Sequence, residues 1–429
     1  MRRARRHRAP GEERVDPVRL ILCGSLRLIC MEGEHISRNC IRFFVKKQAL
    51  GLGRVHYVKG EKPALWRHFP AFSRYFGSFQ PIRVSFRPHM IDKEVLRPFL
   101  KTTLEGTHFK DLGEKYTGKV RDVYLLSPDK RLLIATDRQS AFDTLWCTIP
   151  LKGQVLTHIS AWWFEQIKDV MPTHVLSMPD PNVMLVKNLK MLKIEIVVRG
   201  YLTGSTGTSA WVNYAKGVRN FCGNLLPEGM RKNQKFDSPI ITPTTKAAED
   251  ELIDPAGIIE RGFATRAQWE EISEKALALF KRGQGIAAKR GLILVDTKYE
   301  MGFDEDGVLT IGDEVHTPDS SRYWKASTYE ERHAKGLEPE SLDKEFFRLW
   351  LREQGFDPST HSAHSGQARS GQAYGKPKPV ITDDIRLMLA TKYIDLAERV
   401  TGGPIELPKD PDIPARIERN LKKYRIVAV

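Results

Sequence analysis

A long helical pattern followed directly by two strand patterns most constrains the fold of this chain. Residues 264–291, ATRAQWEEISEKALALFKRGQGIAAKRG, have the spacing of an amphipathic helix, which we expect to stop at Gly291. Residues 292–316, LILVDTKYEMGFDEDGVLTIGDEVH, predict a β-hairpin that turns at Asp306 and Gly307. A helix beside strands paired by a local hairpin is typical of an α+β protein.

Strand pairs and helices are interleaved elsewhere in the chain as well. The other expected elements are a short helix over 90–104, a second hairpin with strands Lys119–Leu126 and Arg131–Thr136, a helix over 153–171, strands within 183–204, and a helix from the N-cap Thr382 to Gly402. This order favours an α+β fold over a strict alternation of single strands and helices.

Basic charge is concentrated in the first fifth of the chain. Residues 1–89 contain 19 Lys and Arg and 6 Asp and Glu, a net charge of +13, whereas residues 90–429 have a net charge of only +2. Three interpretations of the first segment stay open: a solvated basic tail, an organelle transit peptide, and translated upstream sequence with the functional start at Met90. The break in composition favours the third.

The remaining composition argues against several classes of protein. A nearly neutral body is unsuited to charge-driven binding of DNA or RNA. We find no apolar run of about 18 residues, the length that a membrane span needs. Five cysteines without metal-type pairing indicate reduced thiols and a cytoplasmic protein. Residues 356–379, rich in Ser, Gly, Pro and Gln, predict a flexible linker.

A glycine and two cations stand at the start of a predicted strand, in YTGKVRDVY. Lys119 and Arg121 are two residues apart, so we expect them on one face of that strand. Gly118 allows a ligand to approach the backbone closely, which suits a nucleotide polyphosphate. The alternative is an exposed hairpin edge with solvated cations.

Four polar residues follow the buried strand pattern LLIA, in ATDRQSAFD. Charged groups directly after a buried strand often lie in a binding cleft. We therefore regard them as candidate substrate ligands, although a turn with local side-chain caps has the same composition. The four residues are Asp137, Arg138, Ser140 and Asp143.

Acidic and basic side chains alternate along ILVDTKYEMG. Asp296, Lys298 and Glu300 share one strand face, and such a row is costly to bury without partners. The row is explained if Lys298 meets a phosphate and carboxylates hold Mg²⁺, which favours one or two carboxylates plus substrate phosphates. The hairpin partner brings Asp313 toward Glu300. The alternative is a solvated face with cross-strand ion pairs.

The segment IEIVVRGYLTGSTGTSAW passes from a strand pattern into arginine, glycine and hydroxyl groups. Arg199 followed by TGS offers a guanidinium, backbone N–H groups and a hydroxyl, which suit a phosphate monoester better than they suit an ordinary loop. Downstream segments add Asp319 and Arg322, and a predicted loop adds Lys246 and Asp250. The chain contains neither a P-loop pattern nor the glycine pattern of dinucleotide-binding folds.

Five motifs, in this order, closely resemble those of the SAICAR synthetases of purine biosynthesis: GKVRDVY, TDRQSAFD, EIVVRGYLTGS, VDTKYEMG and DEVHTPDSSRYW. The resemblance spans roughly residues 105–402 and is to the extended, yeast-like branch. It implies an ATP-dependent ligase that joins CAIR, 5-amino-1-(5-phosphoribosyl)imidazole-4-carboxylate, to L-aspartate, giving SAICAR, ADP and phosphate. An acyl phosphate is the implied intermediate, because phosphorylation gives the carboxylate a good leaving group.

The fold implied by this resemblance is a two-lobed α+β structure related to ATP-grasp. Residues 90–190 would form a small β-rich lobe that covers ATP, residues 191–355 the catalytic lobe, and residues 380–429 a C-terminal helical segment. ATP and Mg²⁺ are the implied cofactors, and CAIR and L-aspartate the small-molecule substrates. We expect a cytoplasmic monomer or dimer that binds no nucleic acid and no membrane.

The resemblance also implies roles for individual residues. Gly118, Lys119, Arg121 and Lys298 would bind ATP, and Glu300 and Asp313 would hold Mg²⁺. Lys298, Arg199 and Asp319 would form the catalytic group. The candidate substrate ligands, from the residues and the resemblance together, are Asp137, Arg138, Ser140, Asp143, Arg199, Ser205, Lys246, Asp250, Asp319 and Arg322.

Two segments depart from the family pattern. The family usually has KAE-x-G-E-H-D-E-N-I-S where this chain has KAAEDELID, so Glu249 stands at the usual histidine position in a shorter loop beside Asp250. The chain also has TGSTGTSAW where the yeast-like pattern is TGSAW, so either Ser205 or Ser209 would bind the phosphate. We prefer Ser205 because it directly follows Gly204.

Two other functions fit parts of the sequence. A small-molecule kinase would use the same nucleotide and metal groups, but it would release a phosphorylated product without incorporating aspartate. An RNA-binding protein would bind through residues 1–89 with a steep dependence on salt. The nearly neutral body and the lack of an RNA-reading motif argue against the second.

Overall fold

The computed structural model describes residues 19–23, 26–30, 43–45, 91–142, 144–246, 250–356, 378–410 and 412–424. The chain divides into two compact units, Met1–Arg87 and Pro88–Val429. In the first, β1 (Arg19–Cys23), β2 (Leu26–Cys30) and β3 (Phe43–Val45) form an antiparallel sheet. These strands are not evident from the sequence, because the apolar residues of the segment have no sustained period. The linker predicted at 356–379 lies largely outside the described residues.

The second unit contains a five-stranded antiparallel sheet early in its sequence. Its strands, in spatial order, are β4 (Glu114–Thr117), β5 (Arg121–Ser127), β6 (Lys130–Ala135), β10 (Val183–Lys187) and β9 (Val175–Asp180). The β5–β6 hairpin was predicted, but β5 begins at Arg121 rather than Lys119. Lys119 lies in a bend, where the Gly118 N–H donates to the Arg121 carbonyl at 2.8 Å. The prediction that Lys119 and Arg121 share a strand face is therefore wrong.

A seven-stranded antiparallel sheet forms the rest of the framework. Its strands are β11 (Lys190–Met191), β12 (Ile194–Leu202), β15 (Gln234–Ile241), β16 (Thr244–Thr245), β17 (Leu292–Phe303), β18 (Leu309–Gly312) and β19 (Ser321–Lys325). The long strand β17 pairs with β11 and β12 along one edge and with β18 and β19 along the other. The hairpin turn at Gly307, which has φ +75°, was predicted. All these strands follow those of the first sheet in the sequence, and the lobe boundary near 190 stays a prediction.

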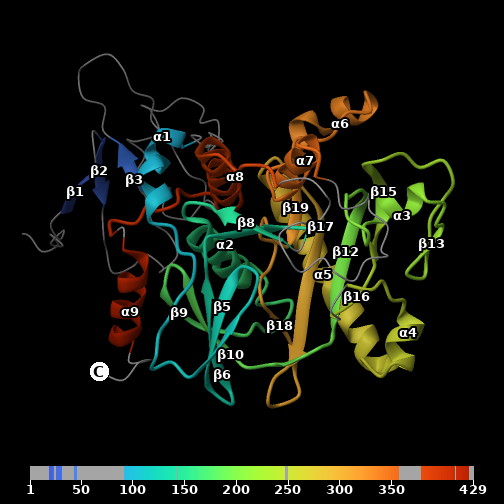
Figure 1. Ribbon diagram of the computed structural model, residues 1–429, viewed down its shortest axis with the longest axis horizontal. Helices are drawn as coiled ribbons and strands as arrows, with labels where there is room; N and C mark the ends of the chain where they lie inside the picture. Colours follow the sequence, from blue (N-terminus) through green and yellow to red (C-terminus); the bar gives the residue numbers. More distant parts are fainter. Residues whose placement is uncertain are drawn as a thin grey trace, which may run out of the picture. The chain divides into compact units, whose positions relative to one another are not determined.

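Helix α5 (Arg266–Lys289) covers β17 and β12, as Figure 1 shows. The Thr265 hydroxyl and the Gln268 side chain form a capping box at its start, and Gly291 follows its end with φ +71°. Its buried face contributes side chains such as Ile272 and Leu279 to the main core. The predicted helix and its stop are thus confirmed.

Other helices surround the two sheets and two short ribbons. They are α1 (Lys93–Leu96) with the 3₁₀ turn Arg97–Lys101, α2 (Lys152–Gln166), α3 (Ala210–Ala215), α4 (Pro255–Glu260), α6 (Ala326–Ala334), α7 (Glu345–Glu353), α8 (Asp383–Thr401) and α9 (Ile413–Lys423). The ribbons are β7 (Arg138–Ala141) with β8 (Thr144–Thr148), and β13 (Asn220–Phe221) with β14 (Asn224–Leu225). Within the described part of the chain, no helix has both the length and the apolar character that a membrane span requires.

The C-terminal helices pack into the second unit. Helix α8 begins at the N-cap Thr382, ends at Gly402 and lies against α2, so the predicted capping residues are confirmed. Helix α9 was not placed from the sequence; Ile413, Ile417 and Leu421 bury its apolar face against the core beneath the five-stranded sheet. A hydrogen-bonded ion pair between Arg416 and Asp180, at 3.0 Å, joins α9 to β9.

We expect Ile417→Ala to lower the free energy of unfolding by about 3 kcal/mol, because the fully buried side chain leaves a cavity between α9 and the sheet. Urea unfolding of the full chain measures this, with the exposed Lys422→Ala as the matched control on the same helix. Equal stability of the two variants would show that α9 is not part of the cooperative core.

Candidate active site

The charged face of β17 forms the centre of the site. Its side chains alternate, so Val295, Thr297 and Tyr299 are buried on one side while Asp296, Lys298 and Glu300 occupy the other. The Lys298 ammonium donates to Glu195 Oε1 of β12 at 2.8 Å and also to Glu300. Glu300 binds Lys246 as well. The predicted acid–base–acid row is therefore confirmed, and Glu195 is its unpredicted partner.

The two central charges stabilise one another. Burial alone would lower the pKa of Lys298, but the carboxylates of Glu300 and Glu195 outweigh burial and raise it. Burial likewise disfavours the Glu300 carboxylate, yet Lys298 and Lys246 lower the pKa of Glu300 to about 2. Both groups are consequently charged at neutral pH. A charged Lys298 suits the binding of an anion, and a charged Glu300 suits the binding of a cation.

Arg121 faces the acidic end of β18. Its guanidinium is held by Asp313 and Glu314. Asp313 directly follows Gly312, which pairs with Glu300 across the β17–β18 ladder. Glu300 and Asp313 therefore lie close together, and this donor pair suits Mg²⁺, which needs only one or two protein carboxylates beside substrate phosphates. Among the described residues there is no cluster of three or more potential metal ligands.

The loop that carries Asp313 is held in place by side chains of β17 and β19. Asp313 and His316 both have positive φ angles, +55° and +51°, which is unusual for non-glycine residues. The Tyr299 hydroxyl meets His316 Nε2 at 2.5 Å, and the Tyr323 hydroxyl donates to the His316 carbonyl at 2.8 Å. A Cβ at Gly283 of α5 would come within 2.4 Å of His316 Cε1, so only glycine fits beneath this loop.

Asp137 and Arg138, predicted as substrate ligands, make internal contacts. The Asp137 carboxylate accepts from the backbone N–H groups of Leu104 and Gly153, and burial raises its pKa to about 6. The Arg138 guanidinium pairs with Asp122 at 2.9 Å. It also donates to the carbonyls of Glu105, Gly118 and Lys119. Through these hydrogen bonds, Arg138 holds the bend at Gly118 and Lys119 in place. Ser140 accepts from Lys344 at 3.2 Å, and Asp143 lies outside the described residues.

Cations converge where β12 ends. Arg199 is buried, donates to the Thr242 hydroxyl and the Thr208 carbonyl, and lies 3.5 Å from Asp296. Arg322 of β19 pairs with the same Asp296 oxygen, Oδ2, at 2.6 Å and with Glu345 of α7 at 3.3 Å. Burial lowers the pKa of Arg199 to about 10, so it stays protonated at neutral pH. The predicted Arg199 and Arg322 are therefore brought together, with Asp296 between them.

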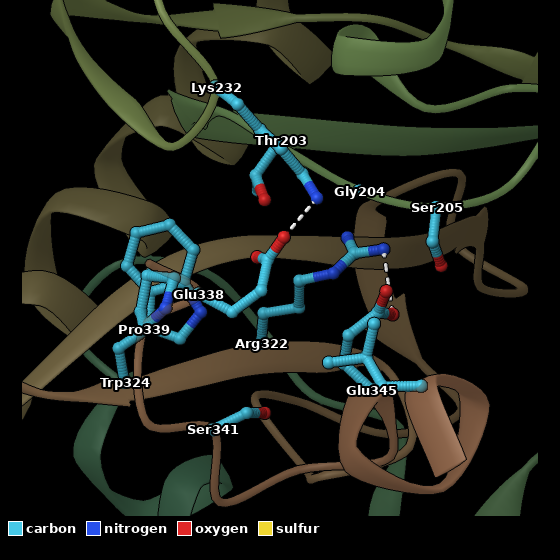
Figure 2. A pocket seen from close by; sticks show the side chains of 11 residues that line it. Thr203, Gly204, Ser205, Lys232, Arg322, Trp324, Glu338, Pro339, Ser341 and Glu345 are labelled. Carbon is cyan, nitrogen blue, oxygen red and sulfur yellow. Dashed lines mark hydrogen bonds and ion pairs between the residues drawn. The ribbon is translucent and has the colours of Figure 1, made fainter. Parts of the chain in front are cut away.

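A pocket opens beside this group, and Figure 2 shows the Arg322–Glu345 pair within it. Gly204 has φ +105°, and a Cβ there would lie 2.5 Å from Ser209 Cβ, so the turn requires glycine. The Ser205 hydroxyl is buried in the pocket wall and, among the described residues, makes no well-formed hydrogen bond, although it lies close to the Glu345 carboxylate. The Ser209 hydroxyl, in contrast, donates to the Thr206 carbonyl at 2.6 Å. Of the two serines, Ser205 has the hydroxyl available for a ligand.

Asp319 lies in a cluster of residues that the sequence did not indicate. Its carboxylate accepts from Lys152 at 2.7 Å and from the Tyr393 hydroxyl at 2.7 Å, and Lys344 lies 3.8 Å away. Burial would raise the pKa of Asp319, but the two lysines lower it well below its usual range. Lys152 is the first residue of α2, directly before the helix expected over 153–171, and no local pattern indicated its role. Tyr393 belongs to α8, far along the chain.

The remaining candidates, Lys246 and Asp250, lie at the surface of the protein. Lys246 pairs with Glu300, and Asp250 is exposed. The departing residue Glu249 lies outside the described part of the chain.

Comparison with known proteins identifies the family. Residues 114–362 match the family model of SAICAR synthetase. The chain belongs to the SAICAR synthetase family. A putative phosphoribosylaminoimidazole-succinocarboxamide synthase 2 of Agrobacterium fabrum is 47% identical over 325 residues, covering 75% of this chain and 98% of that protein. The chloroplastic phosphoribosylaminoimidazole-succinocarboxamide synthase of Arabidopsis thaliana is 49% identical over 311 residues, 72% of each chain.

A solved relative agrees in fold. The SAICAR synthase of Saccharomyces cerevisiae complexed with SAICAR aligns with a TM-score of 0.59 and 30% identity, covering 71% of this chain and all of that one. The expected α+β architecture of the SAICAR synthetase fold is confirmed. The chain is accordingly an ATP-dependent ligase of purine biosynthesis that joins CAIR and L-aspartate to form SAICAR.

We expect Arg138→Met to lower the free energy of unfolding by about 3 kcal/mol, since it leaves the fully buried Asp122 with fewer counter-charges. Urea unfolding measures the loss, and exposed Arg97→Met serves as the control. A variant with wild-type stability but a raised KM for CAIR would instead favour the predicted substrate contact.

Proposed function

We propose that the ligation proceeds through an acyl phosphate at the charged face of β17. A carboxylate oxygen of CAIR attacks the γ-phosphorus of ATP, and the bond to ADP breaks. The amine of L-aspartate then attacks the acyl carbon, phosphate leaves with the electron pair, and the amine gives up a proton. The observation that carries the proposal is the fixed Lys298 cation, held charged between Glu195 and Glu300.

The nucleotide end is assigned to Lys298, Arg121 and the bend at Gly118 and Lys119. Lys298 and Arg121 are now paired with carboxylates, and nucleotide phosphates would take over part of those contacts. Fixed cations stabilise the charge that develops on transferring phosphoryl oxygens without reorganising. Glu300 and Asp313 would hold Mg²⁺, which would neutralise the β- and γ-phosphates when bound.

The substrate end is assigned to Ser205 and Arg322, with Arg199 supporting them from behind. The Ser205 hydroxyl and the Arg322 guanidinium line one pocket, and a phosphate monoester is bound well by such a pair. Asp319 is near both ends: its charge acts on Arg121, and it lies 3.8 Å from Lys344, the chain neighbour of the Arg322 partner Glu345. Lys246, which pairs with Glu300, and Asp250, whose charge acts on Glu195, are assigned to the L-aspartate side.

A small-molecule kinase is the competing chemistry, because it would use the same nucleotide groups. The two differ in what happens to the activated carboxylate. A ligase transfers the acyl group to an amine, whereas a kinase releases a phosphorylated product. The cytoplasm is our proposed location and a monomer or dimer our proposed assembly; the plant relative named chloroplastic makes cell fractionation the useful test of location.

We expect the full chain with Mg-ATP, CAIR and hydroxylamine, without L-aspartate, to form ADP and CAIR hydroxamate in equal amounts. Hydroxylamine traps an acyl phosphate by attacking its carbon. With L-aspartate, ADP and SAICAR should appear together. Lys298→Met should lower both rates by about 10²-fold or more, because it removes a fixed cation from the transferring phosphoryl group. Aspartate-dependent SAICAR without any trapped hydroxamate would contradict the intermediate, and ADP without SAICAR would favour the kinase.

We expect Ser205→Ala to raise the KM for CAIR about tenfold, the equivalent of losing one hydrogen bond to a charged group. Ser209→Ala is the matched control: it should leave KM near wild type, because Ser209 bonds to Thr206 instead. Initial-rate kinetics at saturating ATP and L-aspartate measure both. The reverse pattern would transfer the phosphate contact to Ser209.

A further inference from the structure

Lys344 is a buried lysine that the assignments above leave without a role. It is the N-cap residue of α7, and its ammonium donates to the Ser140 hydroxyl at 3.2 Å and lies 3.8 Å from Asp319. Its side chain is 11% exposed. A buried ammonium group is costly unless its contacts compensate for lost hydration, so its presence calls for an explanation.

The neighbouring Lys152 has the structural task in this cluster. Its side chain is fully buried, and its ammonium is bound at 2.7–2.8 Å between Asp319 and the Arg138 carbonyl. Asp319 also accepts a 2.7 Å hydrogen bond from Tyr393. Asp319 thus has two close partners without Lys344, whose own contacts are longer. Lys344 can therefore turn donors toward a ligand without leaving Asp319 unpaired.

Lys344 also lies between the two ends of the site. Its chain neighbour Glu345 pairs with Arg322 and Arg348 at the substrate end. At the nucleotide end, the charge of Glu314, the partner of Arg121, is close enough to act on Lys344. A substrate with its phosphate near Arg322 and its carboxylate directed to the nucleotide would place that carboxylate beside this ammonium group.

We propose that Lys344 binds the acyl oxygen of the activated substrate and stabilises its negative charge while the amine attacks. This inference rests on the proposed acyl-phosphate route. In that step the C–N bond forms, the carbonyl electrons move onto the acyl oxygen, and they return as the C–O bond to phosphate breaks. A fixed cation beside that oxygen stabilises the transition state more than the ground state.

The charge on Lys344 titrates in an accessible range. Burial is the main cause that lowers the pKa of Lys344, to about 8; Asp319 and Glu314 oppose the lowering, and Lys152 and Arg348 add to it. The protonated form is the active one, so the rate of ligation should fall as the pH rises through about 8. An arginine at this position would keep its charge.

The test compares the full chain with Lys344→Met and Lys344→Arg, with Lys335→Met as an exposed lysine control. We expect Lys344→Met to lower kcat for SAICAR about 10²-fold with the KM for ATP changed less than threefold. Lys344→Arg should recover at least tenfold of this loss and lack the fall in kcat near pH 8. Lys335→Met should match wild type.

Two results would overturn the inference: a kcat for Lys344→Met within threefold of wild type, or the same alkaline fall in Lys344→Arg as in wild type. The second remains decisive if Lys344→Met fails to fold, which thermal unfolding would reveal. A wild-type chain that makes SAICAR without a trapped hydroxamate would contradict the proposed route and not Lys344 itself, because the amine would still attack an acyl carbon.

Discussion

The rest of the site depends on the two-sided burial of β17. Strands pair along both of its edges, and α5 covers one of its faces, so every second side chain is committed to the core. The intervening side chains, Asp296, Lys298 and Glu300, share the other face. Charges placed on so protected a surface are stable only with partners. The neighbouring strands must therefore present ionisable groups at the positions where these charges need partners.

The resulting ion pairs suit a site that handles anions. Removing charges from water is unfavourable, and a close partner recovers only part of that loss. Glu195, Asp296 and Glu345 hold the cations in fixed positions before any phosphate arrives. A phosphate can then exchange with a carboxylate instead of having to order flexible lysine and arginine side chains. Such preorganisation is the main means by which proteins stabilise phosphoryl transfer.

Several residues beneath the site maintain its shape. Arg138 fastens the bend that contains Gly118, and Tyr299 and His316 support the loop that contains Asp313. The type of side chain at these positions matters as much as at the groups they support, because each one forms a hydrogen bond with a buried polar atom. In the motif TDRQSAFD, Asp137 and Arg138 act as such internal supports, and spacing alone does not distinguish a support of this kind from a substrate ligand.

The sequence by itself determined the hairpins, the long helix α5, the helix limits at Thr382 and Gly402, and the charged row of β17. These features depend on local periodicity and capping, which operate within a few residues. Family motifs further indicated the reaction.

The tertiary structure alone decided the partners. Glu195, Lys152, Lys344 and Tyr393 come from four separate elements, and no local pattern relates them to Lys298 or Asp319. Long-range pairing depends on how sheets and helices pack, because the energy of a buried charge is set by whatever lies within a few ångströms of it in space.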